Sequence, residues 1–382
     1  MWRATLFAFV LVGCSTRTAP PEGGKHAPVE HSPAQPHAAP SAAGGDAGHS
    51  TNAFVLEGAE IFGLGKQNLL IDGGRVAAVG VKHDAAARVV DVGGRYVVPG
   101  FIDSHVHLAY YAEGAEELAS NGIVAVLDLA APLRTLSVAH APLRVLNAGP
   151  MLTAPNGYPT NSWGADGYGL GVADPAAGRA AVESLFKAGV QAIKVPLTAA
   201  PTLDDATVKA VVQAAHAHQL KVYTHALEEL NAARAAADGI DVLAHTPTEA
   251  LTEATLEAWK TRTVISTLSA FGGSSATLNN LRALRERGAR VLYGTDFGNT
   301  RETGVQSLEV TQMLAAGMDG PSIIRAGTSV PAEFLGLSDL GTLDVGKRAS
   351  FLVLAADPSL DPHTLSQPIA VYVDGTLVSA GL

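Results

Sequence analysis

The sequence contains very little cysteine: Cys14 is the single one among 382 residues, so no internal disulfide can form. Charged side chains are also scarce, at 16% of residues, and the acidic ones outnumber the basic ones by 36 to 26. No cluster of Lys or Arg stands out, which argues against nucleic acid as a partner, because phosphate binding requires concentrated positive charge. Apolar residues make up 47% of the chain, which is typical of a well-packed globular protein.

Long hydrophobic runs are missing as well. The apolar run at residues 4–12 is shorter than the ~20 residues that a helix needs to cross a bilayer. It follows Arg3 and leads directly to Cys14, so residues 1–14 resemble the signal peptide and lipobox of a bacterial lipoprotein. A lipid on Cys14 would then anchor the protein to the bacterial cell envelope, facing the periplasm or on the outer membrane, as its only membrane contact. An ordinary signal peptide and an apolar start without a targeting role are the alternatives.

Residues 15–52 have almost no large apolar side chains, and Pro, Ala, Gly, Ser and His dominate them. Such a segment cannot form a core, so we predict a disordered linker, although its histidines could bind metal weakly. Short alternating segments separated by glycine follow over 53–99 and return over 336–382. This pattern is typical of short antiparallel strands and predicts a β-rich part at each end of the folded region.

The central region, residues 100–335, alternates apolar segments with Ala-rich amphipathic ones. This pattern predicts parallel βαβ units, and eight strands in this length predict a (β/α)8 barrel. A doubly wound open sheet is the alternative, but no Gly-rich phosphate loop follows the first strand. The expected strands are 101–102, 123–129, 143–148, 192–195, 221–224, 242–244, 263–267 and 290–293.

His105 and His107 stand two residues apart at the end of an apolar, β-branched run. Residues two apart in a strand point to the same face, so both imidazoles can reach one metal ion. Imidazole suits zinc and its neighbours among the divalent metals. The alternative is a pair of partly buried histidines with separate hydrogen bonds.

Four further groups lie on other expected strands. Lys194 lies on the fourth strand, His225 and His245 end the fifth and sixth, and Asp296 ends the eighth. Chemistry in a barrel takes place at the C-terminal ends of the strands. The sequence therefore predicts one site that contains all six side chains.

Several of these stretches resemble the amidohydrolase superfamily, especially its imidazolonepropionase-like and carboxylated-lysine dipeptidase branch. The resemblance covers residue 53 to the C-terminus and implies a TIM barrel with a small β-sandwich formed from both chain ends. The stretches that carry it are 98–107, 148–155, 192–195, 293–296 and 341–349.

The resemblance also implies a role for each candidate residue. His105, His107 and Asp296 would hold one divalent metal ion, and His225 and His245 would hold a second. Lys194, carboxylated by CO2, would bridge the two ions, for which zinc is expected. A free lysine ammonium, with a pKa near ~10, would instead repel two dications.

The implied reaction is hydrolysis of an amide-type carbon–nitrogen bond in a small molecule such as a dipeptide, an N-acyl amino acid or a cyclic amide. The metal ions would acidify a bridging water, and Asp296 would take up its proton and pass it to the leaving group. Hydrolysis is favoured over deamination, because deaminases of the superfamily generally use one metal ion and lack the strand-four lysine. A mononuclear imidazolonepropionase-like hydrolase or lactonase, and a non-catalytic tethered binding lipoprotein, are the alternatives.

Substrate preference is less well defined by the sequence. The segment 155–168 is rich in turn residues and aromatics and is either a cap over the site or an ordinary surface loop. In many relatives the strand-five histidine is followed, after one residue, by His or Tyr, whereas here Ala226 and Leu227 follow His225. This departure weakens a dipeptidase assignment. The remaining histidines of the folded region are expected to be surface or structural residues: His140, His216, His218 and His363.

Overall fold

The computed structural model describes residues 50–82 and 87–380. The expected lipobox at Cys14 and nearly all of the expected linker lie outside the described residues. Contacts along the chain divide it into residues 1–47 and 48–382, and all the described residues belong to the second part. Within the described ranges, every helix is too short or too polar to cross a bilayer.

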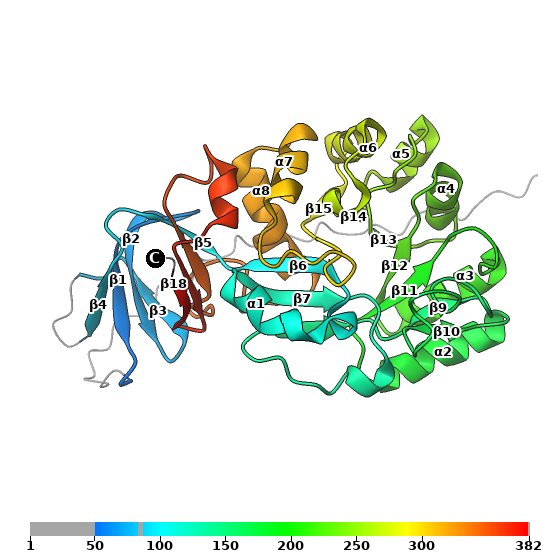
Figure 1. Cartoon of the computed structure of the whole chain (residues 1–382), viewed down its shortest axis with the longest axis horizontal. Coiled ribbons are helices and arrows are strands. Elements are labelled where there is room, and N and C mark those ends of the chain that lie inside the picture. The colour runs from blue at the N-terminus through cyan, green and yellow to red at the C-terminus, as the bar shows by residue number, and fades with distance from the viewer. Residues whose placement is uncertain (1–49, 83–86, 381–382) are drawn as a thin grey trace, which may run out of the picture. The chain divides into compact units, whose positions relative to one another are not determined.

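Strands from both ends of the described chain pair in one eight-stranded sheet (Figure 1). Its order is β18-β17-β16-β5-β1-β2-β3, and β4 pairs with β1. Phe351 of β16 stacks on Tyr372 of β17 with ring centroids 4.7 Å apart, inside this sheet's own apolar cluster. The pairing gives one continuous sheet and does not by itself define the two layers of a sandwich. The strands are β1 (Phe54–Ile61), β2 (Gly65–Asp72), β3 (Arg75–Val79), β4 (Arg88–Asp91), β5 (Tyr96–Pro99), β16 (Phe351–Leu354), β17 (Ala370–Val373) and β18 (Thr376–Ala380).

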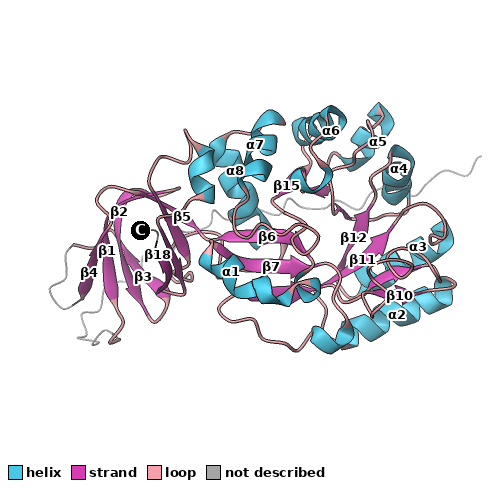
Figure 2. Cartoon of the chain, viewed as in Figure 1, coloured by secondary structure: helices cyan, strands magenta, loops and turns pink. Residues whose placement is uncertain are grey.

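Between these ends, parallel strands alternate with helices, so the chain has the predicted α/β class of fold (Figure 2). The strands form a three-stranded sheet, a five-stranded sheet and a separate pair, and not one closed ladder. The three-stranded sheet contains β6 (Phe101–Val106), β7 (Ile123–Asp128) and β8 (Arg144–Asn147). The five-stranded sheet contains β11 (Ala192–Pro196), β12 (Lys221–His225), β13 (Val242–Leu243), β14 (Thr263–Ile265) and β15 (Arg290–Leu292).

All eight strands expected in the central region are present, and the first is longer than expected. It runs to Val106, so His105 lies inside β6 and not after it. A parallel pair that the sequence did not predict, β9 (Met151–Thr153) and β10 (Gly169–Gly171), flanks the loop 155–168.

Helices cover the parallel strands, and five of them begin at a side-chain cap. Asp174, Asp204, Thr252, Ser274 and Asp319 each accept a hydrogen bond from the backbone N–H three residues later. These caps satisfy N–H groups that a helix start leaves without a partner, and so they fix where the helices begin. The helices are α1 (Ala115–Ser120), α2 (Pro175–Lys187), α3 (Asp205–Ala217), α4 (Glu229–Ala237), α5 (Glu253–Trp259), α6 (Ser275–Glu286), α7 (Ser307–Ala315), α8 (Gly320–Gly327) and α9 (Ser329–Phe334).

The contact between α8 and β6 gives a test of the packing beneath the site. A Cβ at Gly327 would lie 2.2 Å from two ring carbons of Phe101. We expect Gly327→Ala to lower the free energy of unfolding by about 1–3 kcal/mol, because the buried ring and β6 must shift. Denaturant unfolding measures the change. The control is Gly171→Ala, whose methyl would meet nothing closer than 3.6 Å; equal stability of the two variants would contradict this packing.

Candidate metal centre

The structure brings the six predicted side chains into one cluster at the ends of the parallel strands; five of them are buried, and His225 is half-buried. The Nε2 atoms of His105 and His107 lie 3.4 Å apart. Oδ1 of Asp296 lies 3.5 Å from the first and 3.1 Å from the second. These three side chains come from the end of β6 and from the chain just after β15. The first and the last parallel strands of the central region therefore meet here.

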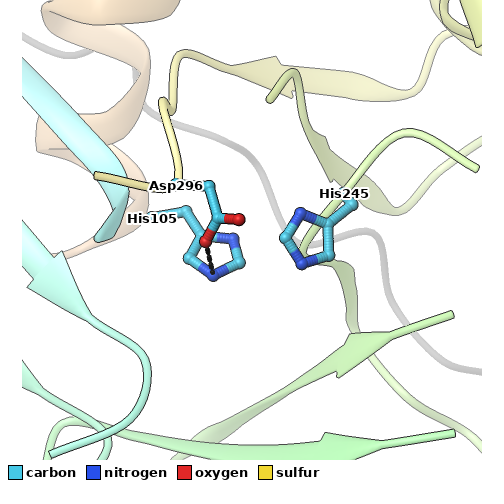
Figure 3. A group of neighbouring side chains, drawn as sticks. All are labelled: His105, His245 and Asp296. Atoms are coloured by element: carbon cyan, nitrogen blue, oxygen red, sulfur yellow. Dashed lines mark ion pairs between the residues drawn. The ribbon is translucent and has the colours of Figure 1, made fainter. Parts of the chain in front are cut away.

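His245, His225 and Lys194 complete the cluster. The His245 ring lies 4.4 Å from the ring of His105 and 4.7 Å from that of His225. Ligand atoms of His105, His245 and Asp296 all lie within 4.8 Å of one another, and Figure 3 shows the three side chains converging. Lys194 is completely buried and within electrostatic reach of all three histidines and of Asp296.

Hydrogen bonding fixes the tautomer of His105. Its Nδ1 lies 2.7 Å from the carbonyl oxygen of Ala244, which can only accept, so Nδ1 carries the proton and Nε2 carries a lone pair. Burial lowers the pKa of His105 and His245 well below the usual value, and that of His225 to about 3. His105, His225 and His245 are therefore neutral and suited to bind metal.

These donors fit a divalent metal ion. Nε2 of His105, Nε2 of His107 and Oδ1 of Asp296 lie 3.1–3.5 Å from one another, so all three atoms can reach one cation placed among them. Nitrogen and carboxylate oxygen are the ligands that zinc takes in hydrolytic sites. The backbone bond from His105 Nδ1 is the support that metal-binding imidazoles usually have.

Lys194 has no hydrogen-bond partner at Nζ among the described residues, although it is fully buried. Burial lowers its pKa to about 7, against an opposing effect of the Asp296 carboxylate. Near neutral pH, much of the amine is therefore uncharged, and the uncharged amine is the nucleophilic form that can add to CO2. The chemistry of this position fits a carboxylated lysine.

Asp103 is a buried supporting residue that the sequence reasoning missed. It accepts hydrogen bonds from the backbone N–H of His105 at 3.0 Å and of Thr295 at 3.2 Å, and from the Thr295 hydroxyl at 2.5 Å. Burial raises its pKa to about 7, although the bonds from Thr295 oppose this. Asp103 thus joins β6 to the segment that carries Asp296. Its spacing of two residues from His105 was the available signal.

The backbone around Asp296 is strained. Asp296 has a φ of 57°, in the left-handed region that residues other than glycine seldom adopt. Asn299 Nδ2 lies 3.3 Å and 3.4 Å from its two carboxylate oxygens. Gly298 has a φ of 106°, and a Cβ there would lie 2.4 Å from the carbonyl oxygen of His107. This tight turn brings the carboxylate to the histidine pair.

A second buried carboxylate, that of Glu309, holds the backbone beside His245, although the two residues are far apart in the sequence. His245 Nδ1 lies 3.1 Å from the Thr267 hydroxyl, and the next two backbone N–H groups, of Leu268 and Ser269, donate to Glu309 at 3.0 Å and 2.7 Å. Glu309 is on α7 and is fully buried. No local sequence pattern links it to His245, so it could be found only from the structure.

Aromatic side chains lie over the metal ligands. Within the loop 155–168, the Trp163 ring lies 5.1 Å from that of His107, and the Tyr158 ring lies 5.3 Å from that of His225. Phe271 lies 4.8 Å from the His245 ring. Burial raises the pKa of Tyr158, so its hydroxyl stays protonated. The geometry agrees with a cap, one of the two alternatives for this loop.

The histidines expected outside the site lie away from the ligand cluster. His216 pairs with Asp241 at 2.9 Å, and His218 pairs with Glu183 at 2.8 Å. His140 and His363 are not among the side chains that contact the cluster. All four therefore fit the expected surface or structural roles.

Residues 96–378 match the Amidohydrolase family, and the chain belongs to this family. The match supports the predicted class of enzyme, a metal-dependent hydrolase that acts on carbon–nitrogen bonds of small molecules. The more specific parts of the prediction, including the branch of the family and the bridged metal pair, are not decided by the match.

Individual relatives carry different activities. Adenine deaminase of Deinococcus deserti is 30% identical over 316 residues, which are 75% of this chain and 53% of the deaminase. Imidazolonepropionase of Streptomyces avermitilis is 47% identical over 51 residues, 13% of this chain and 12% of that protein. The chain thus spans about half the length of the deaminase. A solved Xaa-Pro dipeptidase with methionine in its active site has a TM-score of 0.73 at 20% identity, covering 85% of this chain and 99% of the dipeptidase; this likeness shows the fold alone.

The position of Asp103 predicts that it maintains metal affinity. Asp103→Ala should weaken zinc binding about 10–100-fold, because His105 and the segment before Asp296 lose their common anchor. Competition with a chelator measures the change. The control is Asp174→Ala, which removes a helix cap and should cost about 0.5–2 kcal/mol of stability while leaving zinc affinity unchanged. Wild-type zinc affinity in Asp103→Ala would refute this role.

Proposed function

We propose that the protein hydrolyses an amide-type carbon–nitrogen bond in a small substrate such as a dipeptide, an N-acyl amino acid or a cyclic amide, at a binuclear metal centre. The observation that carries the proposal is Lys194, a fully buried amine beside the clustered histidines that has no hydrogen-bond partner among the described residues. The proposed ligands are His105, His107 and Asp296 for one ion, His225 and His245 for the other, and carboxylated Lys194 for both. Zinc is the metal that this donor set favours.

The alternatives to a carboxylated Lys194 are less favourable on physical grounds. An ammonium ion buried without a partner costs several kcal/mol, and it would also repel any metal held by the histidines. A neutral amine would avoid the charge but would leave its donors unsatisfied. A carbamate is anionic and offers two oxygens, so it satisfies both the metal ions and the electrostatics of the cluster.

The chain's own residues can perform the proton transfers and hold the substrate. When bound, the metal ions would polarise the substrate carbonyl and acidify water at the site. Asp296 would accept the water's proton and deliver it to the leaving nitrogen. Asn299 contacts both oxygens of that carboxylate, and the bond to Ala244 orients His105. Trp163 and Phe271 would exclude bulk water from the ligands beneath them.

We further infer that the two main parallel sheets are segments of one (β/α)8 barrel, with the end sheet as the family's small β-sandwich. The backbone N–H of Ser104 donates to Tyr293 at 2.9 Å, and that of Asp296 donates to His105 at 2.9 Å. On the other side, the N–H of Gln191 donates to Asn147 at 2.8 Å. These bonds link the ends of the two sheets in the order that a closed barrel requires.

Deamination is a second candidate, because the similarity to adenine deaminase extends over 75% of this chain. Water would then displace ammonia from a ring carbon in place of cleaving an amide. A turnover screen of the zinc-loaded protein separates the two, with dipeptides, N-acyl amino acids, lactams, lactones and adenine as substrates. Ammonia release from adenine alone would replace the amide proposal.

Lys194 gives the sharpest test of the bridged centre. After reconstitution with zinc and ¹³C-bicarbonate, the wild type should bind about two zinc ions per chain and show a carbamate carbon signal in NMR. Lys194→Ala should lose that signal, bind about one zinc ion and lose most of its turnover. The matched control is Lys187→Ala, which removes an exposed amine paired with Glu183 and should match the wild type.

Two results would count against this centre. Fewer than one zinc ion per wild-type chain would exclude a binuclear hydrolase. Unchanged metal content and turnover in Lys194→Ala would favour the mononuclear alternative.

We also propose that Cys14 carries a lipid that holds the enzyme at the bacterial cell envelope; Cys14 is outside the described residues, and its sequence context supports the proposal. Cys14→Ala should move the protein from the membrane fraction to the soluble fraction and abolish labelling with a radioactive fatty acid. A wild-type protein without label would contradict lipid attachment. Turnover should stay unchanged, because the described site does not include this residue.

A further inference from the structure

Tyr158 combines burial against the metal ligands with a hydroxyl proton that has no assigned acceptor. Its ring lies 5.3 Å from the His225 ring, and the residue is within electrostatic reach of Asp296. Its hydroxyl oxygen accepts a hydrogen bond from Trp163 Nε1 at 3.0 Å. Among the described residues this is the only hydrogen bond that the hydroxyl makes. The phenolic proton is therefore available to a ligand.

Trp163 fixes the direction of the Tyr158 hydroxyl. The indole packs between His107 at 5.1 Å and Tyr110 at 5.3 Å, measured between ring centroids. Tyr168 lies 5.6 Å from it on another side and is itself held by a hydrogen bond to the Ala109 carbonyl oxygen at 2.9 Å. With the indole held in this way, its N–H occupies one lone pair of the Tyr158 oxygen and limits the rotation of the O–H.

The side chains that follow His225 in the chain do not offer a hydroxyl donor of this kind. Ala226 and Leu227 follow it in the chain, and Phe271 lies 6.1 Å from its ring. A substrate oxygen on this side of the cluster could therefore accept a hydrogen bond from Tyr158. A hydrogen-bond donor aimed at such an oxygen is effective in a site from which water is excluded.

We propose that Tyr158 is a catalytic residue that donates its hydroxyl proton in a hydrogen bond to the substrate carbonyl oxygen; this inference rests on the proposed hydrolysis. As the water oxygen bonds to the carbonyl carbon, the π electron pair moves onto the carbonyl oxygen, and Asp296 takes the water's proton. When the carbon–nitrogen bond breaks, that pair reforms the carbonyl and the nitrogen receives the proton. Tyr158 keeps its own proton throughout and stabilises the charge in between.

The test compares Tyr158→Phe with the wild type on the best amide substrate of the screen. The variant keeps the ring against His225 and loses only the hydroxyl, so kcat should fall about 10²–10³-fold with little change in KM. Calorimetry supplies a readout apart from turnover, with the N-methylphosphonyl derivative of the substrate's leaving amino acid as the probe. Its tetrahedral, anionic group should bind at least about 10-fold more weakly, whereas the product amino acid should bind equally well.

Two further variants separate the hydroxyl from general effects. Trp163→Phe removes the indole N–H that orients Tyr158 and should lower kcat by a smaller factor in the same direction. Tyr372→Phe removes a hydroxyl in the end sheet and should leave kcat unchanged. Zinc content should equal that of the wild type in all three.

The outcomes are distinguishable. An active wild type together with an unchanged kcat and unchanged probe affinity in Tyr158→Phe would overturn the inference and leave the proposed function intact. A zinc-loaded wild type that hydrolyses no amide would overturn both.

Discussion

Three potential metal-ligand atoms are held close together at the end of β6, and this close approach is the constraint on which the rest of the site depends. Nε2 of His105, Nε2 of His107 and Oδ1 of Asp296 lie 3.1–3.5 Å apart. In water each would have its own hydrogen-bond donors, but these side chains are buried. Burial disfavours the charged form of His105, so its Nε2 is free to bind a metal ion. A metal cation among the three atoms would bind all of them and so make the arrangement favourable.

The surrounding structure has to keep these atoms together. Asp103 does so by binding the backbone on both sides of the contact, at His105 and at Thr295. The left-handed backbone at Asp296 and the close approach at Gly298 turn the carboxylate toward the histidines. Strain of this kind costs of order 1–3 kcal/mol per residue and is retained where the surrounding contacts enforce it. The rest of the fold therefore has to offset the free energy of this strain. A bound metal ion would offset part of it.

The side chains of the cluster could be picked out from the sequence because they follow a periodic signal. Parallel strands read as buried apolar runs, and polar residues at their ends stand out, so His225 and His245 could be placed without contact information. The extension of β6 through His105 did not disturb this inference, because the spacing of two residues to His107 was unchanged. Contacts made by loops and by residues distant in the sequence could not be predicted in this way. Trp163 reaches His107 through a conformation that no repeating pattern encodes, and Glu309 lies on a helix far along the chain.

Lys194 is the residue on which the proposed bridged centre depends. Unmodified, a buried amine without a hydrogen-bond partner among the described residues would lower stability at this position. Carboxylation converts the same group from a cation that opposes metal binding into an anion that promotes it. The folded structure would assist this reaction with CO2, because burial lowers the pKa of Lys194 to about 7. Near neutral pH much of the amine is then uncharged and nucleophilic. The desolvation that makes a lysine ammonium unfavourable at this position thus also makes the uncharged, nucleophilic amine available, and bound metal ions would stabilise the carbamate anion formed from it.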